Sequence, residues 1–207
     1  TYVFTPTYIE EGQLIQQPAY SKEPMAQRNE KAIKLLEEAG YSKANPLKFS
    51  ILYNTNENHK KVAIAAASMW KANTKGLIDV KLENQEWKTY IDSRRAGRYD
   101  AARAGWNADY NQATTFGNYF LSNSSNNTAK YANPEYDKAI AESYVATDAE
   151  GRAKAYAKAE EILAKDFGIV PIFNYVNPRL VKPYVKGYSG KDPQDHIYLR
   201  NLYIIKH

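Results

Sequence analysis

The chain has 207 residues, of which 43% are hydrophobic and 25% are charged, enough to bury the core of a globular protein. Its 28 Lys and Arg residues are interleaved with 23 acidic ones, and no basic tract accompanies the formal charge of +5. We therefore expect no nucleic-acid partner. The absence of cysteine excludes disulfides, thiol nucleophiles and thiolate zinc sites. No apolar run approaches the roughly 20 residues of a membrane span.

Residues 24–106 alternate between helical and extended patterns. Apolar spacing predicts three helices, over residues 24–39, 58–73 and 87–96. Gly40 follows the first helix and suits the left-handed position that often ends a helix. Alternating apolar and polar residues predict three strands, over residues 47–53, 78–82 and 99–106. This β-α-β-α-β order predicts mainly parallel strands with right-handed crossovers and a ligand site beyond their carboxyl ends.

Helices are also expected in the second half of the chain. Asn133 followed by Pro134 is typical of a helix start. Residues 147–150 fit a capping box, which opens a helix that reaches about residue 165. Several tyrosines fall on helical faces and are expected in the core: Tyr119, Tyr144 and Tyr156.

The composition changes in the carboxy-terminal part of the chain. Residues 169–175 alternate like a strand, in which Pro171 indicates an edge or an irregular beginning. After Asn177, prolines and glycines become frequent, and an alternating apolar run follows over residues 197–205. We place a boundary at this change, which divides the chain into residues 1–176 and 177–207.

The run from Arg103 to Tyr110 combines a cation, aromatic rings and a carboxylate at the end of the third predicted strand. Upstream, Trp87 and Arg94 stand in the third predicted helix. Such a group suits a zwitterion, because each charge of a ligand needs a partner once it leaves water. The alternative is a strand with an ordinary salt bridge between Arg103 and Asp109 and two core tryptophans.

These segments resemble the binding-cleft segments of the periplasmic oligopeptide-binding proteins, the solute receptors of peptide-importing ABC transporters. The similarity continues through several other segments in the same order: residues 28–41, 53–55, 121–125, 175–183 and 203–207. Family members are considerably longer, so the chain resembles the carboxy-terminal lobe of a two-lobe, type II receptor. The resemblance implies an α/β fold with a mainly parallel sheet flanked by helices. Residues 1–176 would form the ligand-binding lobe, and residues 177–207 would cross back to the amino-terminal lobe.

The resemblance also implies a function. The protein would bind peptides with free termini in the periplasm and deliver them to ABC transporter permease subunits, without catalysis and without a cofactor. Its partners would be those peptides, the permease subunits and the amino-terminal lobe of the same receptor.

Charged residues match family positions that bind the two ends of a peptide. Asp109 matches the position that pairs with the α-ammonium group of the ligand. Arg94 and Arg103 match positions that meet the carboxylate of ligands of differing length, for which a planar guanidinium is well suited. His59 matches a position used by longer ligands, although a polar residue at a helix start can also simply face solvent.

Between the two ends of the ligand, the matched segment would bind the peptide independently of its side chains. The backbone of Gly105, Trp106 and Asn107 matches a segment that bonds to the ligand main chain as an added strand. Trp87, Trp106 and Tyr175 would line roomy side-chain pockets. Some family members have a cysteine where this chain has Asn107, so a disulfide from that position is impossible here.

Catalytic sites are not supported by the sequence. His59, His196 and His207 lie far apart without metal-ligand spacing, and no G-x-S-x-G, P-loop or dinucleotide motif is present. Asp100 and Asp109 could form a carboxylate pair, which keeps a carbohydrate-active enzyme as an alternative of another class.

Related receptors for murein tripeptide, dipeptide, haem or nickel remain alternatives within the binding proteins. The combination of Arg94, Arg103 and Asp109 favours peptides with two free ends over metals, because it offers partners for both terminal charges.

Overall fold

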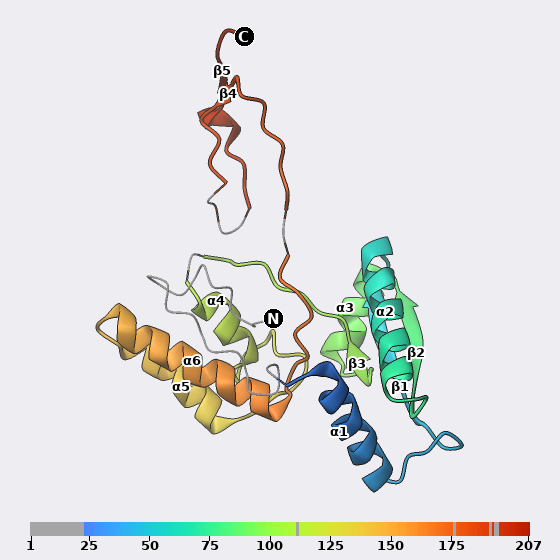
Figure 1. Cartoon of the computed structure of the whole chain (residues 1–207). Helices are drawn as coiled ribbons and strands as arrows, with labels where there is room; N and C mark the ends of the chain where they lie inside the picture. The colour runs from blue at the N-terminus through green and yellow to red at the C-terminus, as the bar shows by residue number, and fades with distance from the viewer. Residues whose placement is uncertain (1–22, 111, 176, 191, 193–194) are drawn as a thin grey trace. The chain divides into compact units, whose positions relative to one another are not determined.

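The computed structural model describes residues 23–110, 112–175, 177–190, 192 and 195–207 (Figure 1). These residues divide into two compact units. The first, which we call the sheet unit, comprises residues 23–105 together with Thr128–Lys130. The second, the helical unit, comprises the described residues of Trp106–Asn127 and Tyr131–His207.

The sheet unit alternates helices and strands along the chain: α1 (Met25–Glu38), β1 (Leu47–Asn54), α2 (Glu57–Asn73), β2 (Ile78–Gln85), α3 (Trp87–Arg95) and β3 (Ala101–Ala102). The strands form a parallel sheet in the order β2-β1-β3. β1 pairs with β2 along its whole length and ends with Asn54 opposite Gln85. This arrangement confirms the predicted α/β class with a parallel sheet flanked by helices.

The strand order determines where the helices lie. The crossover from β1 to β2 and that from β2 to β3 run in opposite directions across the sheet. Right-handed connections then place α2 and α3 on opposite faces. Ile51 and Tyr53 of β1 pack with Ala63 of α2, whereas Leu52 between them points to the other face and is fully buried. The carboxyl ends of β1 and β3 therefore form a switch point, at which open α/β sheets commonly bind ligands.

β3 is much shorter than the strand predicted over residues 99–106. Its two residues pair with β1, and the N–H of Arg103 adds one bond to the carbonyl of Leu52 at 2.8 Å. Just before β3, the carboxylate of Asp100 accepts bonds from the backbone N–H (2.8 Å) and hydroxyl (3.0 Å) of Ser50. The side chain of Asp100 thus takes the place of backbone hydrogen bonds between strands just before β3. The prediction of a longer strand is wrong.

Gly40 ends α1 as the sequence predicts. Its φ of +87° lies in the left-handed region, and its N–H donates to the carbonyl of Glu37 at 2.9 Å. The N–H of Tyr41 reaches back to the carbonyl of Leu36 at 3.0 Å, which completes the paired bonds typical of a glycine-ended helix.

The helical unit contains α4 (Thr114–Gly117), the 3₁₀ turn η4 (Asn118–Phe120), α5 (Pro134–Val145) and α6 (Ala149–Asp166). Asn133 caps α5 as predicted, with its side chain accepting the N–H groups of Glu135 and Tyr136. The predicted capping box over residues 147–150 is wrong by one residue. Asp148 caps α6 by accepting the N–H of Gly151 at 2.6 Å, because its carboxylate is the stronger acceptor.

The core of the helical unit lies between α5, α6 and the α4–η4 segment. It consists of nine buried residues: Ala113, Phe120, Tyr136, Ala139, Ile140, Ala153, Tyr156, Ala159 and Leu163. Tyr119 packs against this core, which confirms the prediction for Tyr119 and Tyr156. Tyr144 is 60% exposed instead, because its hydroxyl is bonded at the surface to the amide of Asn118.

Residues 169–175 do not form the predicted strand. Pro171 has no N–H that could donate a hydrogen bond to a neighbouring strand, and none of the strands in the described part of the chain pairs with this segment. Later, β4 (Val185–Lys186) pairs antiparallel with β5 (Tyr203–Ile204). The 3₁₀ turn η5 (Leu199–Asn201) interrupts the alternating run over residues 197–205.

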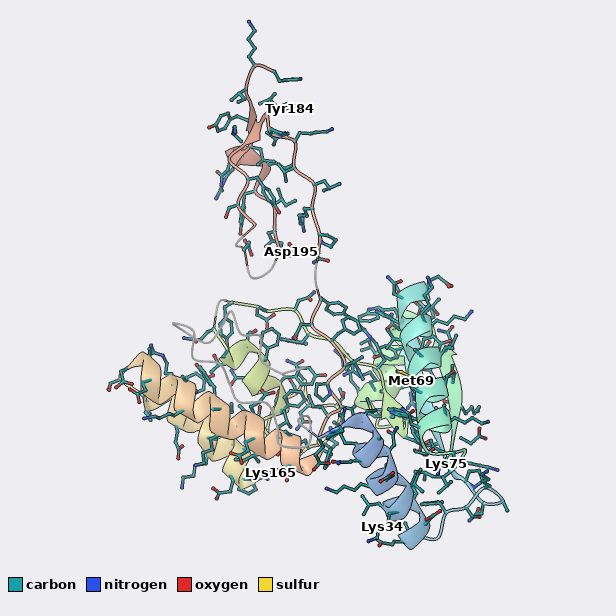
Figure 2. The ribbon with its side chains drawn as sticks, in the orientation of Figure 1. Lys34, Met69, Lys75, Lys165, Tyr184 and Asp195 are labelled. Atoms are coloured by element: carbon teal, nitrogen blue, oxygen red, sulfur yellow. The ribbon has the colours of Figure 1, made fainter. Side chains whose placement is uncertain are left out.

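A carboxylate ties residues 177–179 to the segment before η5. Asp195, which is labelled in Figure 2, accepts hydrogen bonds from the amide of Asn177 at 2.6 Å and the guanidinium of Arg179 at 2.5 Å. The separate role predicted for residues 177–207 stays a prediction.

Two kinds of feature are absent from the described residues. None of their helices is both long enough and apolar enough to cross a lipid bilayer. Nor do their histidine and acidic side chains gather into a group that could hold a metal ion.

Candidate ligand-binding site

One face of α3 carries an aromatic and cationic row. Trp87, Tyr90 and Arg94 follow each other at spacings of three and four residues, which places them on the same side of the helix. The rings of Trp87 and Tyr90 are 5.8 Å apart between centroids, and the guanidinium of Arg94 lies 5.5 Å from the centre of the Tyr90 ring. Each of these residues thus touches the next along the helix.

Arg94 is held by groups of its own unit. Its side chain donates to the hydroxyl of Thr128 at 2.9 Å and to the hydroxyl of Tyr90 at 3.5 Å, and the residue is only 9% exposed. Thr128 is fixed in turn, because its carbonyl accepts the hydroxyl of Tyr99 at 2.8 Å. The short segment Thr128–Lys130 therefore anchors a buried cation.

Arg103 is fixed on both sides of its backbone. Its N–H bonds to β1, and its carbonyl accepts a hydrogen bond from the hydroxyl of Tyr90, which is completely buried. Burial lowers the pKa of the Arg103 guanidinium, the neighbouring Tyr90 phenol opposes this shift, and the positive charge of Arg94 adds to it. The two guanidinium groups are thus close enough to interact.

His59 joins these two arginines at the carboxyl edge of the sheet. It lies in the first turn of α2, where the side chain of Asn56 accepts its N–H at 3.2 Å. Burial lowers the pKa of the His59 imidazole, and the positive charge of Arg103 lowers it further. The ring is half-buried, so the alternative of a histidine fully in solvent does not hold.

Three buried polar atoms lie at the same end of the sheet unit. They are Nδ1 of His59, Oδ1 of Asn54 and Oε1 of Gln85, and none forms a hydrogen bond with a residue in the described ranges. Asn54 and Gln85 are opposite each other at the ends of β1 and β2. Buried polar atoms of this kind are costly unless a partner is supplied, so they favour a polar ligand at this edge.

The composition of this edge suits an anionic group with several oxygen atoms. Two guanidinium groups and an imidazole can all donate to a carboxylate, and a guanidinium can do so with two parallel bonds. Besides burial, the charge of Arg94 lowers the pKa of Arg103, and the charge of Arg103 lowers the pKa of His59. A bound anion would therefore relieve repulsion within each of these two pairs.

The segment from Gly105 to Asn107 has a free main chain. None of its three residues forms a backbone hydrogen bond with any residue that the structure describes. The ring of Trp106 packs edge-on against Tyr119 at 5.1 Å, and its buried indole N–H has no acceptor among the described residues. This stretch has the properties of an edge to which an extended chain can be added.

Asp109 is exposed and lightly held. Its backbone N–H donates to the hydroxyl of Thr115 at 2.9 Å, and the same hydroxyl donates to its carboxylate at 3.3 Å. No ion pair joins Asp109 to another residue in the described part of the chain. Its carboxylate can therefore take up a cation from outside.

The predicted site residues fall into two groups. The sheet unit holds His59, Trp87, Arg94, Arg103 and Gly105, and the helical unit holds Trp106, Asn107, Asp109 and Tyr175. Trp87 and Tyr175 are both about half exposed, at 56% and 49%. Tyr175 packs edge-on against Phe173 at 5.4 Å. The roles of all nine residues in ligand binding stay predictions.

Two residues of this arrangement were missed from the sequence. Tyr90 stands three residues after Trp87 and four before Arg94, so helical spacing alone could have placed it beside both. Thr128 carries no such signal, because its contact with Arg94 spans 34 residues.

Comparison with known proteins identifies the family. The family model of the bacterial extracellular solute-binding proteins, family 5 Middle, matches residues 1–128. The chain belongs to this family.

Two relatives within these solute-binding proteins are especially similar. The periplasmic oligopeptide-binding protein OppA of Haemophilus influenzae is 97% identical over 207 residues, which are all of this chain and 38% of that protein. The periplasmic murein peptide-binding protein MppA of Escherichia coli is 49% identical over 179 residues, covering 86% of this chain and 33% of its own.

A solved structure supports the same relation. The crystal structure of Haemophilus influenzae OppA in complex with RPPGFSPFR matches this chain with a TM-score of 0.88 and 96% identity, covering 100% of this chain and 40% of that one. The chain thus spans well under half the length of the relatives that it matches. These relatives are named as binding proteins.

Proposed function

We propose that this chain is part of a periplasmic receptor that binds oligopeptides and delivers them to the permease subunits of an ABC importer, without converting them chemically. The observation that carries the proposal is the 97% identity, over the whole chain, to an oligopeptide-binding protein. Residues 1–176 would belong to the ligand-binding lobe, and residues 177–207 would cross back to the amino-terminal lobe.

The two charged groups suit the two ends of a peptide. Asp109, which is exposed and bonded to Thr115 among the described residues, would pair with the α-ammonium group. Arg103 directly after β3, His59 in the first turn of α2 and Arg94 in the last turn of α3 would take the carboxylates of ligands of different lengths.

The middle of the ligand would be bound by its main chain. Among the described residues, none forms a backbone hydrogen bond with Gly105, Trp106 or Asn107, and the bonds of an added strand form with almost any peptide sequence. Trp87, Trp106 and Tyr175 would provide aromatic walls for side chains of differing size.

A receptor for another ligand is the second candidate. The 49% identity to a murein peptide-binding protein supports a murein peptide. Dipeptide, haem and nickel receptors have less support, since the site offers charged partners rather than a group of metal-binding side chains within the described ranges. A carbohydrate-active enzyme that uses Asp100 is disfavoured because both bonds of its carboxylate go to Ser50.

Native mass spectrometry of the full-length receptor, purified without refolding, tests the proposal. We expect discrete added masses that correspond to peptides. Calorimetric titration with Ala-Ala-Ala, its N-acetylated form, its amide and murein tripeptide should then follow on the stripped receptor. Tight binding of Ala-Ala-Ala with a loss for each capped form supports the proposal. Binding of murein tripeptide alone, or turnover of glycans, would contradict it.

A further inference from the structure

We propose that Tyr90 is a positioning residue, which sets the guanidinium groups of Arg103 and Arg94 for the carboxylate of a short peptide. The inference rests on the proposed function and deepens it. It names a residue that does not meet the ligand itself, because the side chain of Tyr90 is completely buried.

The first support is the place of Tyr90 in the backbone geometry. Arg103 is the residue directly after β3, and a single bond from its N–H to Leu52 ends the sheet there. The carbonyl of Arg103 accepts a hydrogen bond from the hydroxyl of Tyr90. The direction in which the chain leaves the sheet, and with it the start of the Arg103 side chain, therefore depends on this phenol.

The second support is the place of Tyr90 between two like charges. The phenol oxygen has one proton, which goes to the Arg103 carbonyl, and two lone pairs that can accept from guanidinium groups. Arg94 donates to it at 3.5 Å and also lies over its ring. The Tyr90 phenol also raises the pKa of the Arg103 guanidinium, against the larger lowering by burial. A neutral acceptor shared by two cations lets them stay close together.

The third support is that the far side of Arg94 is also fixed. Thr128 accepts from the other terminal nitrogen of Arg94 at 2.9 Å and is itself held by Tyr99. Arg94 therefore has a defined position, and Tyr90 contacts both arginines. A site prepared in this way loses less conformational entropy when the carboxylate binds.

The variant Tyr90→Phe tests the proposal in the full-length receptor. It keeps the ring against Trp87 and Arg94 and removes only the hydroxyl. We expect the affinity for Ala-Ala-Ala to fall about tenfold, since one hydrogen bond and the alignment of a charged group are lost. The affinity for its carboxamide should change less than about twofold, because that ligand brings no carboxylate to align.

Tyr136→Phe is the matched control. Tyr136 is also fully buried and donates to a backbone carbonyl, that of Gly117 at 2.8 Å, but it lies in the core of the helical unit. Both variants should lower the melting temperature, and only Tyr90→Phe should reduce the ratio of the two affinities. An equal loss for both peptides, or an unchanged ratio, would overturn the proposal.

A second pair of variants covers the case in which Tyr90→Phe does not fold. Thr128→Val should reduce the ratio of free acid to amide, whereas Thr128→Ser keeps the hydroxyl and should leave the ratio intact. If the unaltered receptor already binds both peptides equally, the proposed carboxylate site is wrong. If the unaltered receptor binds the free acid more tightly than the amide, and both Tyr90→Phe and Thr128→Val keep this preference, only the positioning role is wrong.

Discussion

In the sheet unit, the predicted partners of the ligand carboxylate are buried and bonded to their neighbours. Arg94 is held by Thr128 and Tyr90, and the backbone of Arg103 is bonded on both sides. In the helical unit, Asp109 stands exposed, and among its described neighbours only Thr115 forms hydrogen bonds with it. The two groups of predicted ligand partners are thus built in different ways.

The difference concerns the stage, folding or ligand binding, at which each charged side chain loses its conformational freedom. A buried arginine that is already fixed loses little freedom when a carboxylate arrives, although it was costly to bury during folding. An exposed aspartate costs little to place, but it must be ordered and desolvated when the ammonium group binds. We expect substitutions at the carboxylate side to affect both stability and binding, and substitutions at Asp109 to affect binding alone.

The largest effect is expected for Asp109→Asn in the full-length receptor. Binding of Ala-Ala-Ala should weaken by about 1.5 kcal/mol or more, because a charge-assisted bond to the ammonium group is lost. Calorimetric titration measures the loss, and thermal unfolding should show an unchanged melting temperature. Asp92→Asn, an exposed carboxylate on α3, is the control for charge. If N-acetylation costs the unaltered receptor nothing, Asp109 is not the ammonium partner.

A smaller effect, which depends on ligand length, is expected for the arginines. Arg103→Gln and Arg94→Gln should give different profiles across di-, tri- and tetrapeptides, since guanidinium groups at different depths cannot meet one short ligand equally. An extended tripeptide spans roughly 10 Å and a nonapeptide roughly 30 Å. RPPGFSPFR should therefore be less sensitive than the short ligands to both changes. Parallel losses at every length, measured by titration, would refute this division.

The smallest effect is expected from pH. Burial and the charge of Arg103 lower the pKa of His59 below its ordinary value of 6.5 in the free protein. A ligand carboxylate beside the ring raises that pKa again, so binding takes up protons. The affinity for a tetrapeptide should rise modestly as the pH falls from about 6.5 to about 5.5, a range in which the peptide's amino group stays largely protonated and its carboxylate largely ionised.

His59→Gln should remove this pH dependence. His196→Gln, which changes an exposed histidine of the helical unit, should retain it. The same titrations with the tetrapeptide amide should show no rise. A rise that persists in His59→Gln would assign the proton uptake to another group.

The sequence predicted those features that depend on neighbours along the chain. The α/β order, the glycine that ends α1 and the Asn133 cap of α5 each follow from a few adjacent residues. The start of α6 was misplaced by one residue, because Thr147 and Asp148 are both suitable caps and the geometry selected the carboxylate.

Features that depend on distant partners were predicted less well. The strands expected over residues 99–106 and 169–175 have the right alternation, but a strand needs a neighbour, which alternation does not specify. In the same way, the sequence supports a prediction of which charged residues bind the ligand, but it could not show that Thr128 reaches Arg94.

No described residue forms a backbone hydrogen bond with the segment from Gly105 to Asn107, which affects the selectivity of the proposed receptor. Every residue offers the same carbonyl, and every residue except proline offers the same N–H. The peptide RPPGFSPFR in the Haemophilus influenzae structure contains three prolines, so it brings three fewer donors than most nonapeptides. A strand that bonds to the ligand main chain would therefore distinguish proline from other residues, but it would bind nearly all other residue types alike.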